Sequence, residues 1–122
     1  MNRFFAILAI LLLLAITVLS VVPPHYRTTT PLPHKLEHGV VFALAGFAFG
    51  LGFAMRLSVQ VAVLVAFAAA IELVQLGIPG RHARLSDFIV DAVGCGLGAA
   101  LASALARGTA AGRGNAQSGD KA

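Results

Sequence analysis

The residues with the clearest chemical potential lie between positions 71 and 91, in the stretch IELVQLGIPGRHARLSDFIVD. Glu72 and Gln75 are near the end of one apolar segment, and Asp87 and Asp91 are near the start of the next. A carboxylate within an apolar span costs ~2.5–3.5 kcal/mol on insertion scales, so such side chains usually face a protein interior or a wet cavity. The stretch therefore predicts a polar site held between apolar segments.

Glu72 is the first candidate for function. It shares a helical face with Gln75 and lies ~10 Å inside the expected span. It could act as a proton acceptor or bind a ligand, or it could form a salt bridge with Lys35, Arg81 or Arg84. We favour the functional interpretation because the acid lies deep. Gln75 suits an interhelical hydrogen bond.

Asp87 and Asp91 have different expected roles. Asp87 or Ser86 can cap the start of the following helix through a side-chain oxygen. Asp91 lies one turn deeper, where it could form a carboxylate dyad with Glu72 and support acid/base catalysis. A cation from the preceding turn could instead neutralise Asp91, and the sequence leaves both interpretations open.

The sequence HKLEH, from His34 to His38, matches the form of a zinc-protease motif. That motif needs both histidines on one helix and a further ligand, whereas this stretch follows Pro33 in a segment that its prolines predict to be extended. We expect no metal ion, and His38 is expected to hydrogen-bond one of the acids. No phosphate-binding glycine loop is present, so we expect no cofactor. Cys95 is the single cysteine and is interpreted as a packing residue.

The composition indicates a membrane protein. Of 122 residues, 58% are hydrophobic and 11% are charged, whereas about a quarter of a soluble domain is charged. The net charge of +4 does not indicate a nucleic-acid partner, because the basic residues lie between apolar runs and form no stripe with aromatic residues.

Four apolar runs predict an all-α, polytopic membrane four-helix bundle, with spans at residues 4–22, 39–55, 57–78 and 88–106. The first run could be a secretory signal, but no A-x-A site follows it, so we favour a retained span. We expect residues 1–22 to form the first transmembrane helix, 23–37 an extracytoplasmic loop, 38–106 a three-helix core and 107–122 a disordered tail. The short turn at Arg56 predicts an antiparallel pair of spans two and three.

Two G-x-x-x-G patterns, at Gly46 and Gly50 and at Gly94 and Gly98, predict close approach of a neighbouring helix and would permit homo-oligomers. Four spans place both termini on one side. That side carries five basic residues and the other carries four, so the termini are predicted to be cytoplasmic. All the histidines and four of the five acids belong to the opposite side: His25, His34, His38, His82, Glu37, Glu72, Asp87 and Asp91.

The order of these residues resembles the VanZ-like family of small bacterial membrane proteins. The resemblance covers residues 35–106 and rests on Lys35 and His38, Glu72-x-x-Gln75, Pro79-Gly80-Arg81, Asp87 and Gly94. The sequence departs from the family pattern at Asp91, where Asn is frequent, and at Phe42, where Tyr is frequent. The resemblance implies a multi-pass protein of the bacterial inner membrane, in a family whose name comes from a link to resistance to the glycopeptide teicoplanin.

The leading hypothesis is a non-catalytic envelope protein that binds the head group of a membrane lipid or of a cell-wall precursor. The alternative is a membrane hydrolase or transferase acting on a lipid-linked substrate, with Glu72 or Asp91 as base. A proton or ion path through the same two acids is a third hypothesis. The sequence leaves open whether the protein is an enzyme. The residues expected to line the site are Lys35, His38, Glu72, Gln75, Arg81, Asp87 and Asp91.

Overall fold

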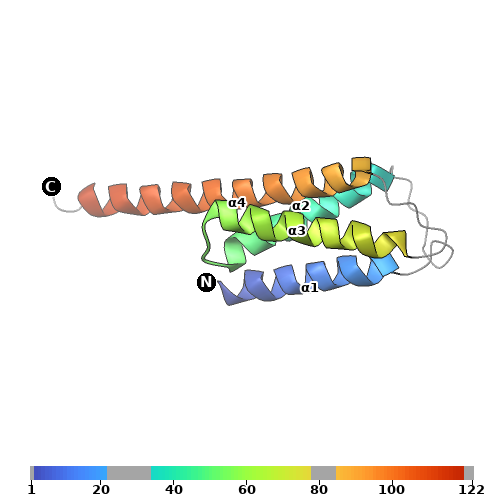
Figure 1. The fold of residues 1–122 in the computed structure, drawn as a ribbon. Helices are drawn as coiled ribbons and strands as arrows, with labels where there is room; N and C mark the ends of the chain where they lie inside the picture. The colour runs from blue at the N-terminus through green and yellow to red at the C-terminus, as the bar shows by residue number, and fades with distance from the viewer. Residues whose placement is uncertain (1, 22–33, 78–84, 120–122) are drawn as a thin grey trace.

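The computed structural model describes residues 2–21, 34–77 and 85–119 and contains four helices in these ranges (Figure 1). They are α1 (Arg3–Val21), α2 (His34–Gly52), α3 (Leu57–Leu76) and α4 (Leu85–Gly119). The described residues contain no strand. The predicted all-α membrane bundle is therefore confirmed.

Helices α2 and α4 form the main packing interface, although α3 separates them in sequence. Gly39 lies against Gly94, and further along both helices Gly50 lies against Ala102, so the two helices run in the same direction. Helix α1 packs mainly on α2, and α3 packs mainly on α4. Helices α2 and α3 run in opposite directions, as expected, but they barely touch, so the predicted α2–α3 pair is not a packing unit.

Glycines make the α2–α4 interface close. A Cβ added to Gly46 would collide with the carbonyl oxygen of Cys95, and one added to Gly98 would collide with the carbonyl oxygen of Ala43. Only residues without a side chain let backbones come this near. The prediction that the glycine patterns admit a neighbouring helix is confirmed. Because these glycines pack within the chain, they give no basis for a homo-oligomer.

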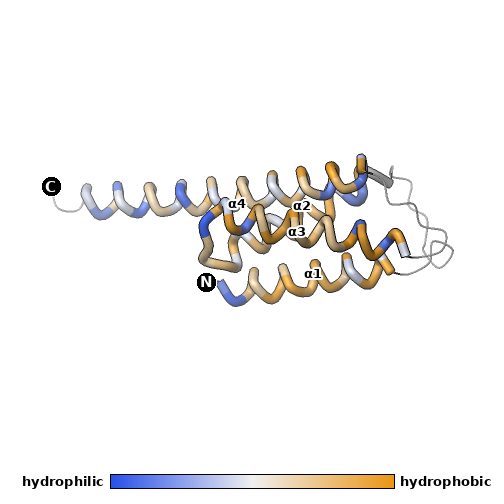
Figure 2. Tube along the Cα trace, viewed as in Figure 1, coloured by the Kyte–Doolittle hydropathy of each residue, from blue (hydrophilic) through white to orange (hydrophobic). Residues whose placement is uncertain are grey.

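The bundle buries mainly small and polar side chains and exposes many large apolar ones. Its buried core includes alanines, Phe42, Leu64 and Cys95, whereas leucines, valines and isoleucines on all four helices are exposed. Figure 2 shows this apolar character along α1 and the bundled part of α4. Helices α1, α3 and α4 are long and apolar enough to cross a membrane, and the apolar part of α2, Leu36–Gly52, is shorter. Lipid is the solvent that suits such a surface.

Helix α2 begins earlier than expected. Residues up to 37 were predicted to form a loop, but the helix starts at His34. Proline is well tolerated at the start of a helix, so Pro33 need not prevent helix formation directly after it. Glu37 lies in the first turn, where the helix dipole favours an acid. The expectation that His34 and His38 lie outside one helix is therefore wrong; the side chains of His34 and Lys35 are outside the described part.

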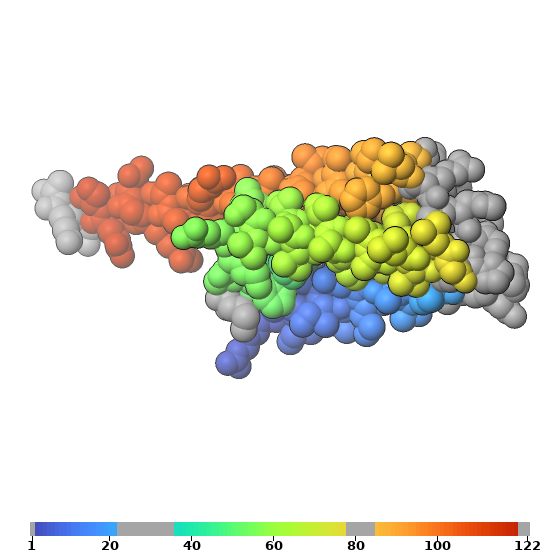
Figure 3. Space-filling view, viewed as in Figure 1, coloured from blue at the N-terminus to red at the C-terminus, as the bar shows by residue number. Residues whose placement is uncertain are grey.

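Helix α4 is longer than the predicted span. It begins at Leu85 and continues to Gly119, so the prediction of a disordered tail from residue 107 is wrong for residues 107–119. Alanine is the best helix former, and its frequency here offsets the unfavourable glycines. A helix of 35 residues is ~52 Å long, against ~30 Å of hydrocarbon. Its C-terminal part accordingly projects beyond the other helices (Figures 1 and 3).

Candidate functional site

The helix directions bring most of the predicted site residues to one end of the bundle. Helices α2 and α4 begin at the end where α3 finishes, opposite the two termini (Figure 1). The polar cluster, as we call it, consists of His38 on α2, Glu72 and Gln75 on α3, and Asp87 and Asp91 on α4.

Asp91 and His38 form the best-defined contact of the polar cluster. The carboxylate of Asp91 is 0% exposed, and its Oδ1 lies 3.5 Å from Nδ1 of His38, whose side chain is 16% exposed. The neighbouring Gly39 and Gly94 let α2 and α4 approach closely at this level. The glycine packing therefore brings the imidazole next to the acid, but the predicted hydrogen bond between His38 and an acid is not formed with Asp91.

Phe42 supports the imidazole from within the bundle. Its ring is 1% exposed and is stacked with the ring of His38, with centroids 6.3 Å apart and planes inclined by 21°. Phe67 of α3 packs on Phe42 at the same centroid distance. This aromatic layer forms the apolar floor of the polar cluster. Sequence reasoning did not predict this role, although one helical turn separates Phe42 from His38.

Glu72 joins the cluster from α3. It is 8% exposed, and it interacts electrostatically with Asp91, Asp87 and His38. Glu72 therefore lies within electrostatic range of Asp91, whose pairing with Glu72 or with a cation the sequence left open. Gln75 is also buried on α3. Cys95, one turn after Asp91 on α4, is fully buried.

Three acidic oxygens of the cluster lack a hydrogen-bond donor among the described residues. They are Oε2 of Glu72 and both Oδ1 and Oδ2 of Asp91. Buried polar atoms are nearly always hydrogen-bonded, because an unsatisfied one costs about 1–3 kcal/mol and a charged one costs more. These oxygens therefore need donors from outside the described residues.

Asp87 lies at the outer edge of the cluster. Because α4 starts at Leu85, Asp87 belongs to the first turn and not to the cap position that the sequence suggested. An acid there interacts favourably with the helix dipole. The side chains of Lys35 and Arg81, also predicted to line the site, are outside the described part. Among the residues that are described, no three histidine, cysteine or acidic side chains are placed to hold a metal ion.

A comparison with models of protein families identifies the family of this chain. The model of the VanZ/LLP1 family matches residues 4–106, which include the first helix and every residue of the polar cluster. The chain belongs to the VanZ/LLP1 family. A search of curated proteins and a search of solved structures found no significant match.

The family match extends beyond the predicted resemblance of residues 35–106, because it takes in α1. It ends at residue 106, so the helical extension after Ala106 lies outside the part shared with the VanZ/LLP1 family. The polar cluster, the aromatic layer beneath it and the glycine interface all lie within the shared part.

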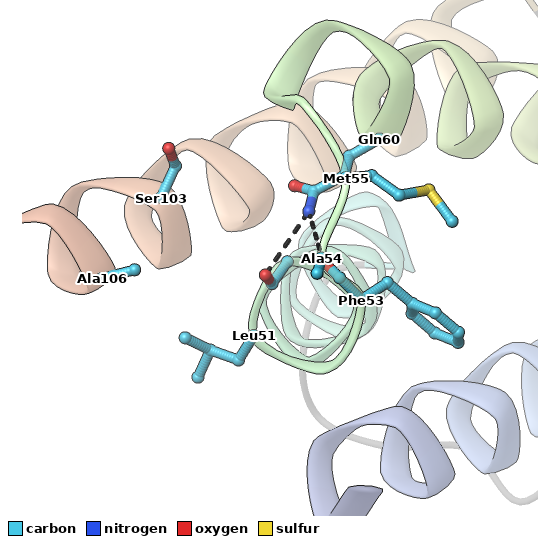
Figure 4. Close-up of a pocket in the computed structure, with 8 residues that line it drawn as sticks. Leu51, Phe53, Ala54, Met55, Gln60, Ser103 and Ala106 are labelled. Atoms are coloured by element: carbon cyan, nitrogen blue, oxygen red, sulfur yellow. Dashed lines mark hydrogen bonds between the residues drawn. The ribbon is translucent and has the colours of Figure 1, made fainter. Parts of the chain in front are cut away.

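The VanZ/LLP1 match also includes a buried polar side chain at the opposite end of the bundle. Gln60 of α3 donates from Nε2 to the carbonyl oxygens of Phe53, at 3.0 Å, and Gly50, at 3.5 Å. The bond to Gly50 engages a carbonyl in the last turn of α2, and the carbonyl of Phe53 also accepts from the backbone N–H of Met55. Gln60 also lines a pocket of about 280 Å³ between the α2–α3 turn and α4 (Figure 4). Sequence reasoning assigned no role to Gln60.

Proposed function

We propose that this protein is a multi-pass protein of the bacterial inner membrane that binds the head group of a lipid or of a lipid-linked cell-wall precursor. The polar cluster is the proposed binding site. The observation that carries the proposal is Asp91, which is fully buried with both carboxylate oxygens lacking a donor among the described residues. Ionisable groups within membrane spans are costly and are typically functional.

The position of the cluster favours a ligand that comes from the membrane. It lies where α2 and α4 begin and α3 ends, and large apolar side chains are exposed around that end on α2, α3 and α4. A head group could enter the cluster while its acyl chains remain beside these apolar residues. Family membership adds a context, since the VanZ-like name comes from a link to teicoplanin resistance, and teicoplanin is a glycopeptide. We therefore include cell-wall precursors among the ligands to be tested.

A second candidate function is catalysis on a lipid-linked substrate. The contact between His38 and Asp91 favours it, because a carboxylate beside an imidazole can orient that ring for proton transfer. Glu72, which interacts electrostatically with both residues, would be the base or the partner that shares a proton. Arg81 would stabilise developing charge. Such an enzyme would be a hydrolase or a transferase.

One comparison tests both functions. Lipids and cell-wall precursors would be profiled by mass spectrometry in cells that produce the wild-type protein, Glu72→Gln or the control Arg56→Gln. Arg56 is exposed in the turn at the other end of the bundle, so this control also removes one charge but should leave the cluster intact. Protein levels in the membrane would be matched, and the lipids that co-purify with each variant would be measured in parallel.

The outcomes separate the two functions. A species that co-purifies with the wild type and with Arg56→Gln, but not with Glu72→Gln, supports binding. A cellular species that is consumed or formed only when Glu72 is intact supports the enzyme and identifies its substrate class. If cellular profiles and co-purified lipids are the same for all three proteins, both functions are wrong for this site.

A further inference from the structure

The three unsatisfied oxygens of the polar cluster have a common chemical preference. Oε2 of Glu72 and both carboxylate oxygens of Asp91 are hydrogen-bond acceptors, and each belongs to a side chain that is more than nine-tenths buried. An ionised carboxylate only accepts hydrogen bonds. A group that satisfies these atoms must therefore supply donors, and a positive charge would make those hydrogen bonds stronger.

The charge of the described cluster also favours a positively charged ligand. Its titratable side chains are the carboxylates of Glu72, Asp87 and Asp91 and the imidazole of His38, with the thiol of Cys95 below Asp91. Among the described residues, three acids and a single imidazole leave an excess of negative charge, and the side chains of Lys35 and Arg81 lie outside the described part. Buried charges are normally paired, because an uncompensated one is very costly in a medium of low dielectric constant.

From these observations we infer that the polar cluster binds a primary ammonium group, carried by the head group of an amine-bearing phospholipid. The inference rests on the proposed function and specifies the ligand class of the same site. A primary ammonium has three N–H donors, which equals the number of unsatisfied oxygens. A quaternary ammonium has no donor and is typically bound by an open aromatic cage, whereas Phe42 is stacked beneath His38 and buried.

The surroundings of the cluster favour a phospholipid over a soluble amine. Leu36 of α2, Leu73 and Leu76 of α3 and Leu85 of α4 are all at least half exposed at this end of the bundle. Their side chains offer apolar surface next to the acids. A ligand with an ammonium group and acyl chains would contact both the acids and this apolar surface, whereas a free amine would contact the acids alone.

The test uses the full-length protein in lipid nanodiscs made of phosphatidylglycerol with a small fraction of a second lipid. The second lipid is either phosphatidylethanolamine, which has a primary ammonium, or phosphatidylcholine, which has a trimethylated one. Lipids that remain bound would be counted by native mass spectrometry for the wild type, Glu72→Gln, Asp91→Asn and the control Arg56→Gln. Competition with soluble glycerophosphoethanolamine would separate recognition of the head group alone from recognition of the whole lipid.

We expect wild type and Arg56→Gln to retain phosphatidylethanolamine about tenfold more strongly than phosphatidylcholine, and both acid variants to lose that preference. Tenfold corresponds to 1.4 kcal/mol, less than most hydrogen bonds to a charged group contribute. Displacement by glycerophosphoethanolamine would locate the affinity in the head group, and failure to displace would support the phospholipid as ligand.

Two results would overturn the inference, and they can be told apart. If the wild type retains phosphatidylglycerol in a Glu72-dependent way but shows no preference for phosphatidylethanolamine, the ammonium inference is wrong while head-group binding stands. If no lipid is retained differently by the wild type and by the two acid variants, the inference is wrong and the proposed binding function loses its support in lipids. Glu72→Gln and Asp91→Asn both keep the size of the side chain. If one of these variants fails to fold, the other still tests the inference.

Discussion

Asp91 is fully buried beside His38, and the two residues come from helices that are not consecutive in the chain. At a separation of 3.5 Å the two side chains are in contact without the geometry of a strong hydrogen bond. Phe42 holds the imidazole from below. The position of each side chain therefore depends on its neighbours, so substitutions at His38 and Asp91 should not be independent.

A double-mutant cycle tests this coupling. We expect His38→Gln and Asp91→Asn, combined, to change the free energy of unfolding by an amount that differs from the sum of the single changes by about 0.5–3 kcal/mol, as found for residues in contact. Unfolding would be followed in detergent micelles. Asp91→Asn combined with Ser58→Ala, an exposed residue on α3, serves as the additive control. Additivity in both pairs would mean that the His38–Asp91 contact contributes nothing.

At the scale of the elements, the α2–α4 interface decides the arrangement of the bundle. Gly98 faces the backbone of α2, so close to Ala43 and Phe47 that it leaves no room for a Cβ. Two residues earlier, Gly96 has nothing within 4 Å of its would-be Cβ. The same helix therefore offers a glycine that is needed for packing and one that is not.

Gly98→Ala should destabilise the protein, and Gly96→Ala should not. A methyl group at Gly98 would push α2 and α4 apart, and overpacking of this kind typically costs about 1–3 kcal/mol. At Gly96 the same substitution should be neutral or slightly stabilising, because alanine favours the helix over glycine by up to ~1 kcal/mol. Thermal unfolding of both variants in the same detergent measures the difference. Equal melting temperatures would show that the close α2–α4 contact does not form.

At the scale of the whole molecule, both termini lie at the end opposite the polar cluster (Figure 1). Arg3, Arg56, Arg107 and Arg113 belong to the terminal end of the bundle and its helical extension, and all are exposed. Basic residues are retained on the cytoplasmic side during insertion. This distribution predicts that the polar cluster opens on the extracytoplasmic side.

Cysteine labelling tests the orientation. In a Cys95→Ser background, Arg56→Cys should react in intact cells with a membrane-permeant maleimide but not with an impermeant one. Thr29→Cys, between α1 and α2, should react with both reagents. The reverse pattern would place the termini outside the cytoplasm and the polar cluster inside. The native Cys95 is fully buried, so its replacement by serine mainly removes background labelling.

The sequence by itself determined that the chain is a helical membrane protein, because its apolar runs have the length of membrane spans and too few charges accompany them to cover a soluble domain. It also identified Glu72 and Asp91, since an acid within an apolar run stands out against its neighbours. The ends of α2 and α4 were less predictable, because helix boundaries depend on local capping and on alanine and glycine content, which the apolar pattern does not reveal.

Only the tertiary structure decided which residues meet. Chain order favours contact between consecutive helices, but backbone approach through Gly39, Gly94 and Gly98 pairs α2 with the more distant α4. That pairing brings His38 to Asp91 and places Phe42 under the imidazole. Helical periodicity fixes which face a residue occupies. Which helix covers that face depends on surface shape, and here the absence of side chains at the glycines determined it.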